Sequence, residues 1–141
     1  MRKKLWMMLL LALSVCMLAS CADLMRPVNE QNAINKLNAL QADYESKGYE
    51  VTRADETAVA AFAESLASGE GLELKGAVAG LLEYSFVDPD TGKILIGRAI
   101  AVTDNADAKA IEKLYKSYRE NTGDTEIKVT RKGKIVEVVY S

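Results

Sequence analysis

The sequence LEYSFVDPDTGKILIGRAIAV, residues 82–102, decides the fold. Its first six residues largely alternate apolar and polar side chains and are rich in β-formers, as expected of a strand with one buried face. Pro89 presets its own φ for a turn and Gly92 can adopt a positive φ, so residues 88–92 favour a tight reversal. Residues 93–102 then return as the partner strand. The stretch therefore predicts an antiparallel β-hairpin.

The returning strand is apolar on both of its faces. Such a strand is normally covered on both faces. We expect either that an N-terminal helix or a loop buries the face made of small residues, or that this face binds a second copy or a ligand. One face carries Ile94, Ile96, Ile100 and Val102, interrupted by Arg98, and the small-residue face carries Leu95, Gly97, Ala99 and Ala101.

Upstream of the hairpin the pattern predicts a helix, a short strand and a second helix. Apolar residues at helical spacing over residues 29–47, followed by Gly48, predict the first helix. Residues 49–53 alternate and predict the strand. Asp55 is the expected N-cap of a helix that closes near Gly69. The glycine-rich residues 69–80 predict a connecting loop or a short helical turn.

Downstream, Thr103 or Asp104 is expected to cap a helix that ends at residues 121–123. Residues 126–131 and 134–140 predict a last hairpin around Lys132-Gly133. From residue 49 onward the order is strand, helix, strand, strand, helix, strand and one extra strand. This order predicts an α+β fold: a ferredoxin-like antiparallel sheet with helices on one face, an extra N-terminal helix and a C-terminal β-hairpin.

The composition is that of one packed domain. The chain has 141 residues, 18 Lys+Arg and 20 Asp+Glu, and a formal net charge of −2. No nucleic-acid partner is expected, because nucleic-acid-binding domains are usually strongly basic. The chain has no histidine, which removes Ser-His and Cys-His catalytic pairs and imidazole metal ligands.

The first twenty residues have the three-part layout of a secretory signal peptide. A cationic start at Arg2, Lys3 and Lys4 precedes an uncharged, mostly apolar run over residues 5–18 and the small residues Ala19 and Ser20. The run is shorter than the about 20 apolar residues that span a bilayer. We therefore expect a leader that is cleaved rather than a membrane-spanning helix.

Leu18-Ala19-Ser20-Cys21 resembles the lipobox of bacterial lipoproteins. The resemblance implies cleavage between Ser20 and Cys21 and lipidation of the Cys21 sulfur. It divides the chain into a signal peptide (1–20), a lipidated tether (21–28) and a single α+β domain (29–141). The implied location is the cell envelope: the outer membrane if the source has one, and otherwise the outer face of the cytoplasmic membrane. The body is similar to small bacterial lipoproteins in Gly48-Tyr49-Glu50-Val51 and Lys132-Gly133-Lys134.

Sequence motifs for catalysis or metal binding are weak. Asp88-x-Asp90-x-Gly92 begins like a calcium loop, but Gly92 and Ala99 stand where the fifth and twelfth positions need oxygen ligands. A hairpin turn explains these residues without a metal. Nothing in the sequence places a pair of carboxylates in an apolar cleft, as acid and base catalysis requires. We expect no enzyme activity, no cofactor and no metal site.

Basic side chains concentrate in the last hairpin, at Lys128, Arg131, Lys132 and Lys134. They are candidate ligands for anionic lipid headgroups or wall polymers. Interspersed acidic residues such as Glu126 and Glu137 also fit a solvated, charged edge that deters aggregation.

The expected function is a non-catalytic binding or protein-interaction module, held at the membrane through Cys21, with an envelope protein as its candidate partner. One alternative is a carrier of anionic lipid or wall polymer that uses the basic hairpin. The other alternative is a small envelope hydrolase.

Overall fold

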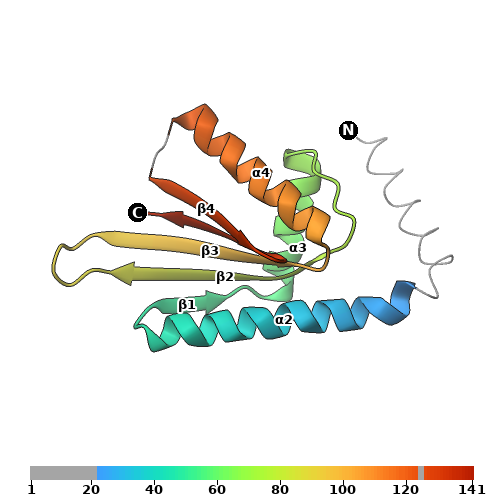
Figure 1. The fold of residues 1–141 in the computed structure, drawn as a ribbon, viewed down its shortest axis with the longest axis horizontal. Helices are drawn as coiled ribbons and strands as arrows, with labels where there is room; N and C mark the ends of the chain where they lie inside the picture. The colour runs from blue at the N-terminus through green and yellow to red at the C-terminus, as the bar shows by residue number, and fades with distance from the viewer. Residues whose placement is uncertain (1–21, 124–125) are drawn as a thin grey trace.

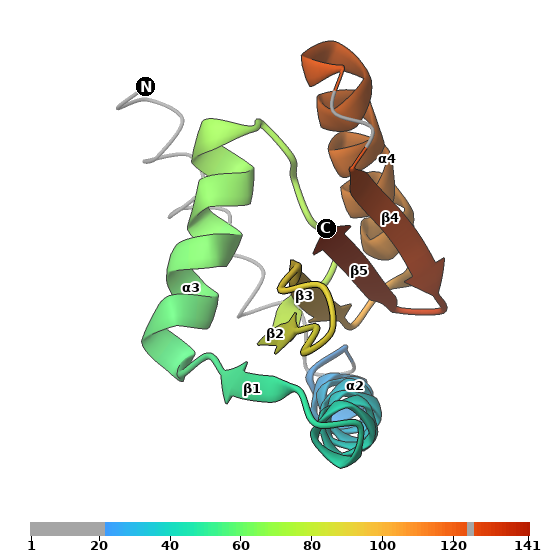
Figure 2. The same cartoon turned by 90° about the vertical axis from the view of Figure 1, so that its left-hand side faces the viewer.

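The computed structural model describes residues 22–123 and 126–141. Its centre is a five-stranded antiparallel sheet in the order β1-β2-β3-β5-β4. Helices α3 and α4 lie on one face of this sheet and α2 lies on the other (Figures 1 and 2). The elements are α2 (Ala22–Ser46), β1 (Glu50–Arg53), α3 (Glu56–Glu64), the π-helical turn η1 (Ser65–Gly69), β2 (Val78–Val87), β3 (Ile94–Val102), α4 (Asn105–Thr122), β4 (Ile127–Lys132) and β5 (Ile135–Tyr140).

The predicted α+β class is confirmed, together with the antiparallel sheet, the extra N-terminal helix and the C-terminal hairpin. The order of the strands differs in one respect from the ferredoxin-like pattern. In that pattern the two strands flanking the first helix are split by another strand. Here β1 and β2, which flank α3, pair directly with each other, and the four-residue β1 forms an edge of the sheet.

The hairpin of β2 and β3 is confirmed, and it is longer than predicted. Its turn is closed by a hydrogen bond from the Asp88 N–H to the Lys93 carbonyl, 2.9 Å, and Gly92 has a φ of +70°. β2 begins at Val78, so the last part of the predicted 69–80 loop is a strand. Gly80 explains the difference: a Cβ there would stand 2.8 Å from Leu37 Cδ2, so α2 packs closely onto this glycine. Glycine within a strand often marks such an approach.

Each face of the sheet has its own hydrophobic core. On the face of α3 and α4, Ile100 and Val102 of β3 pack with Ile111 of α4. On the face of α2, Ala99 and Ala101 pack with Leu37. Thus α2 buries the small-residue face of β3, as the first of the two sequence-based alternatives predicts.

The helix ends follow the expected chemistry, except at the start of α2. Asp55 caps α3 by accepting a hydrogen bond from the Ala58 N–H, 2.8 Å. Asp104, one of the two predicted caps, accepts from the Ala106 N–H at the start of α4, 2.7 Å. α2 begins at Ala22 rather than Asn29, so residues 22–28, predicted as a tether, are helical.

Candidate functional site

The basic residues predicted as one anion-binding surface are divided between different parts of the fold. Arg131 lies on the α4 side of β4, where its Nε is 3.3 Å from Glu112 Oε1. Lys128 and Lys132 are exposed and, by strand alternation, belong to the other face of β4. Lys134 lies in the β4–β5 turn. The structure therefore does not gather these four side chains into one site.

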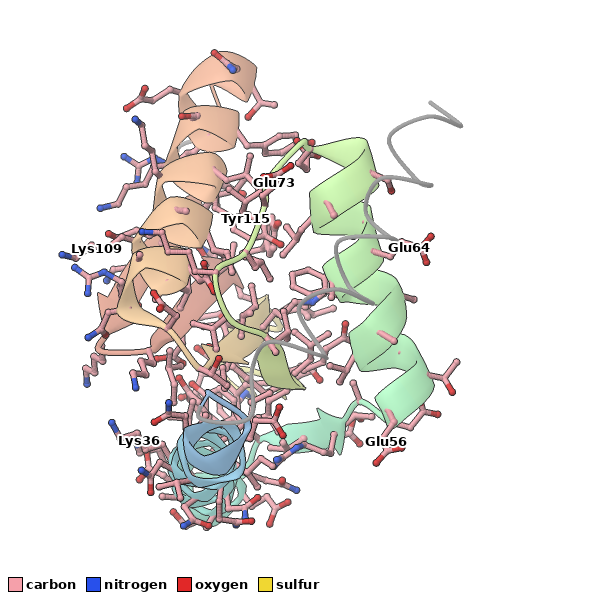
Figure 3. The ribbon with its side chains drawn as sticks, turned by 90° about the vertical axis from the view of Figure 1, so that its right-hand side faces the viewer. Lys36, Glu56, Glu64, Glu73, Lys109 and Tyr115 are labelled. Atoms are coloured by element: carbon pink, nitrogen blue, oxygen red, sulfur yellow. The ribbon has the colours of Figure 1, made fainter. Side chains whose placement is uncertain are left out.

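Lys134 instead meets α2 at a small hollow of about 320 Å³. Lys36 of α2 also lines this hollow, and Figure 3 shows it on the opposite side of the molecule from Glu56 and Glu64 of α3. No local pattern in the sequence links Lys36 to Lys134, because 98 residues separate them. The lining is completed by Asn32, Ala33, Asn35 and Ile135.

A patch of large apolar side chains stays exposed near the tip of the β2–β3 hairpin. The strand register places Val87 opposite Ile94, and Ile96 opposite Tyr140. These four residues, which we call the apolar hairpin face, lie on the α3 and α4 face of the sheet but beyond the helices, with 58%, 57%, 54% and 41% exposure in that order. The uncovered apolar surface therefore lies on the opposite side of β3 from the small-residue face considered in the sequence analysis.

The lipobox residues, including the predicted cleavage site at Ser20 and Cys21, lie outside the described residues. α2 begins immediately after Cys21, and its Ala22 end lies at the opposite end of the molecule from the β2–β3 turn (Figure 1). None of the helices in residues 22–123 and 126–141 combines the length and apolar character that crossing a membrane requires.

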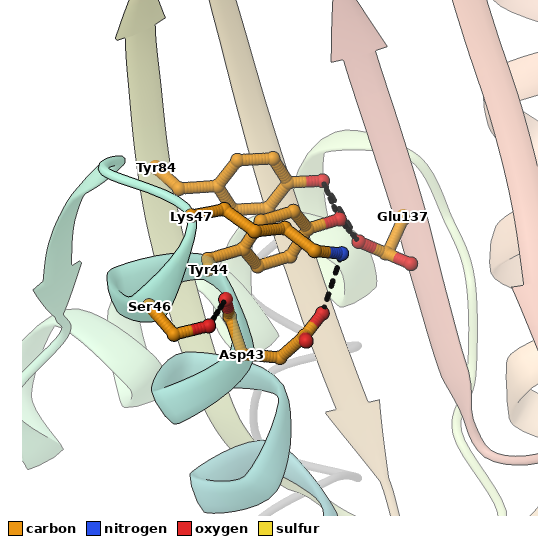
Figure 4. Close-up of polar contacts among 6 residues, drawn as sticks. All are labelled: Asp43, Tyr44, Ser46, Lys47, Tyr84 and Glu137. Atoms are coloured by element: carbon orange, nitrogen blue, oxygen red, sulfur yellow. Dashed lines mark hydrogen bonds and ion pairs between the residues drawn. The ribbon is translucent and has the colours of Figure 1, made fainter.

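Two tyrosines and a carboxylate join α2 to the sheet (Figure 4). The hydroxyls of Tyr44 and Tyr84 both donate hydrogen bonds to Glu137 Oε1, at 2.5 Å and 2.8 Å. The two rings are stacked with their centroids 4.0 Å apart. Burial and the hydrogen bond to Glu137 raise the pKa of Tyr44 to about 12. The pKa of Tyr84 is raised as well, chiefly by burial.

These raised pKa values decide what the tyrosine cluster can do chemically. At neutral pH both phenols stay protonated and act as hydrogen-bond donors, so neither provides the phenolate that a general base or nucleophile needs. The two hydroxyl donors belong to α2 and β2, and the carboxylate that accepts their hydrogen bonds belongs to β5. The cluster therefore links α2 to the sheet by hydrogen bonds.

A second hollow, of about 570 Å³, lies between α2 and α3 at the edge of the sheet. β1 pairs with β2 only over Leu82–Ser85, so the segment Val78–Gly80 has no strand partner on that side among the described residues. Arg53 stands at this hollow, and its Nη1 donates to Asn38 Oδ1 at 2.8 Å. The guanidinium thereby ties β1 to α2.

The described residues hold no cluster of three or more His, Cys, Asp or Glu side chains that could bind a metal ion. Asp88 serves the hairpin turn, where its Oδ1 accepts a hydrogen bond from the Asp90 N–H, 2.8 Å. The chain was also compared with protein-family models, curated proteins and solved structures, and none of them matches it.

Proposed function

We propose that the chain is an exported bacterial lipoprotein whose domain is a non-catalytic protein-interaction module. The cationic start, the apolar run and Leu18-Ala19-Ser20-Cys21 support cleavage before Cys21 and attachment of lipid to it. Acylation with two or three chains holds a protein at a bilayer stably, whereas a single chain binds only marginally. The expected location is the outer membrane, or the outer face of the cytoplasmic membrane in a source without an outer membrane.

The position of the apolar hairpin face carries the proposal for the domain. α2 is 25 residues long, or about 37 Å at the usual rise of a helix. Anchored through the residue before Ala22, the domain holds the hairpin face at its far end, away from the bilayer that carries the anchor (Figure 1). The occupant of this face is therefore a protein in the envelope with a matching apolar surface, rather than the lipid of the anchoring membrane.

The surroundings of the apolar hairpin face favour a specific protein contact over non-specific association. The ion pair of Arg98 with Glu83, 2.5 Å, borders the apolar residues on the same face of the sheet. An apolar centre with a polar rim is the usual anatomy of a protein interface. Exposed apolar clusters of this kind commonly mark interaction sites.

The lipid anchor is tested with Cys21→Ser. Cells that express the wild-type chain and grow with a palmitate analogue should yield labelled protein whose mass corresponds to a chain that starts at Cys21 and carries acyl groups. The Cys21→Ser chain should take up no label. Equal labelling of both chains, or an unmodified wild-type protein, would refute the anchor.

The docking face is tested with Ile96→Glu and with Val28→Glu as its matched control. Val28 is also half-exposed, at 51%, but lies on α2 outside the hairpin face. Cross-linking in native envelopes should capture a defined protein with the wild-type chain and with Val28→Glu, and this capture should be lost with Ile96→Glu. Light scattering of the purified protein should show a monomer. A dimer that Ile96→Glu dissociates would mean instead that a second copy occupies the face.

The alternative of an anionic ligand bound by the basic hairpin retains only Lys134 of its four residues at a hollow, where Lys36 of α2 joins it.

A further inference from the structure

We propose that the hollow between α2 and the β4–β5 turn binds a phosphate group, with Lys36 and Lys134 as its two cationic ligands. This site is separate from the apolar hairpin face and does not depend on what docks there. It also differs from the basic surface that the sequence indicates, because it replaces Lys128, Arg131 and Lys132 with a lysine from α2.

Both lysines project from backbone that is firmly held. Lys36 is flanked on α2 by Ala33 and Leu37, which are 2% and 0% exposed against the sheet. The Lys134 carbonyl accepts a hydrogen bond from the Val102 N–H of β3, 3.0 Å. Gly133 precedes it with a φ of +58°, which permits a tight turn. The backbone of both residues is therefore fixed beside the hollow, so only the torsions of the two side chains have to be ordered around a ligand.

Neither lysine is neutralised within the described part of the chain. Lys47, Lys116 and Arg131 each have a carboxylate within 4 Å, whereas no ion pair involves Lys36 or Lys134. Two neighbouring uncompensated cations create a positive potential that attracts an anion. Charge-assisted hydrogen bonds from both ammonium groups would then hold it.

The remaining lining favours phosphate as the bound group. Asn32 and Asn35 add side-chain amides, and the Asn35 oxygen already accepts a hydrogen bond from Gln31, 2.9 Å, which leaves its amino group free to donate. Two ammonium groups and two amides match the several oxygens of a phosphate better than the two oxygens of a carboxylate. Ala33 and Ile135 form an apolar floor for a small group attached to the phosphate. The source is either a phospholipid headgroup or a soluble phosphate.

The test uses the full chain, labelled with 15N, in neutral detergent micelles. In one arm inorganic phosphate replaces chloride at constant ionic strength, and in the other phosphatidylglycerol is added to the micelles without phosphate. Amide shifts are followed in the wild type, Lys36→Gln, Lys134→Gln and the control Lys113→Gln, which changes an exposed lysine of α4 that has no ion pair with residues 22–123 or 126–141. Amide shifts that stay unchanged outside the hollow show that a variant is folded. If Lys134→Gln does not fold, the result for Lys36→Gln alone decides whether the site exists.

The proposal predicts saturable shifts at residues 32–36 and 134–135, in the wild type and in Lys113→Gln. Each substitution in the hollow should weaken the binding about tenfold, the scale of one hydrogen bond to a charged group. Saturation by phosphatidylglycerol at the lower concentration identifies a lipid headgroup, and the reverse identifies a soluble phosphate. Shifts that do not saturate, or that persist unchanged in Lys36→Gln and Lys134→Gln, overturn the site. Either result leaves the capture test at Ile96 unaffected.

Discussion

Gly97 makes a close contact with Tyr84 on the face of the sheet that α2 covers. A Cβ at this position would stand 2.1 Å from Cε2 of Tyr84, so the tyrosine ring lies directly over the glycine. Gly97→Ala should lower the free energy of unfolding by about 3 kcal/mol, because the added methyl group must displace the Tyr84 ring, which α2 and the sheet hold in place. Urea denaturation measures the change. Gly69→Ala is the control, because a Cβ there meets nothing within 4 Å. Equal effects at the two glycines would contradict the close fit.

Because of Tyr44, the free energy of unfolding should vary with pH in the alkaline range. Its pKa is about 12 in the folded chain, against about 10 for an unperturbed tyrosine. Because folding raises the pKa, the protonated phenol stabilises the fold fully below pH about 10, and this contribution is lost as the pH rises through about 12.

Tyr44→Phe should therefore be less stable by about 1 kcal/mol at neutral pH. It should also lose stability less steeply than the wild type above pH about 10, although Tyr84, whose pKa folding also raises, still contributes to the slope. Urea denaturation across this pH range gives both quantities. Parallel pH profiles for the two proteins would show that the Tyr44 hydroxyl does not contribute.

Among the elements, the loop before β2 is held to the first turn of α4 by a buried carboxylate. Asp107 is only 2% exposed, and its two oxygens accept hydrogen bonds from the backbone N–H groups of Lys75 at 2.7 Å and Gly76 at 2.8 Å. Asp107→Asn turns one acceptor into a donor that faces another donor. We expect a loss of about 1–3 kcal/mol, measured by urea denaturation, and faster hydrogen exchange in the loop before β2. Unchanged exchange in this loop would mean that other contacts hold it.

The sequence predicted those elements whose signals are local. Asp55, Asp104 and the DPDTG turn act within a few residues, and the structure places caps and a turn there. The start of β2 was missed because its glycine fits against Leu37, 43 residues away. The same cause separates the basic surface predicted from the sequence from the hollow that Lys36 and Lys134 line. Arg131 is paired with Glu112 and Lys134 adjoins Lys36, and both relations arise only from the packing of distant segments.

For the whole molecule, the lipid anchor proposed at Cys21 would turn the Ala22 end of α2 toward the membrane. Val28 lies about 9 Å along α2 from Ala22, whereas Asp90 is in the hairpin turn at the other end. In lipidated protein on vesicles, a membrane-impermeant maleimide should label Val28→Cys more slowly than in detergent, and Asp90→Cys equally fast in both. In the proposed mature form neither native cysteine would react with the maleimide, because Cys16 would be removed with the leader and Cys21 would carry the lipid. Equal slowing at the two positions would mean that the domain lies flat on the bilayer.

The direction of α2 has a mechanical consequence. The helix runs alongside the β2–β3 hairpin for most of the length of the molecule (Figure 1). Tension between the anchor at one end and a partner on the apolar hairpin face at the other would therefore act along the axis of α2. Such a load shears all contacts between α2 and the sheet at once instead of peeling them apart one by one. Single-molecule pulling through the N-terminus and Asp90 should give one cooperative rupture, whereas stepwise release of α2 at low force would exclude shear loading.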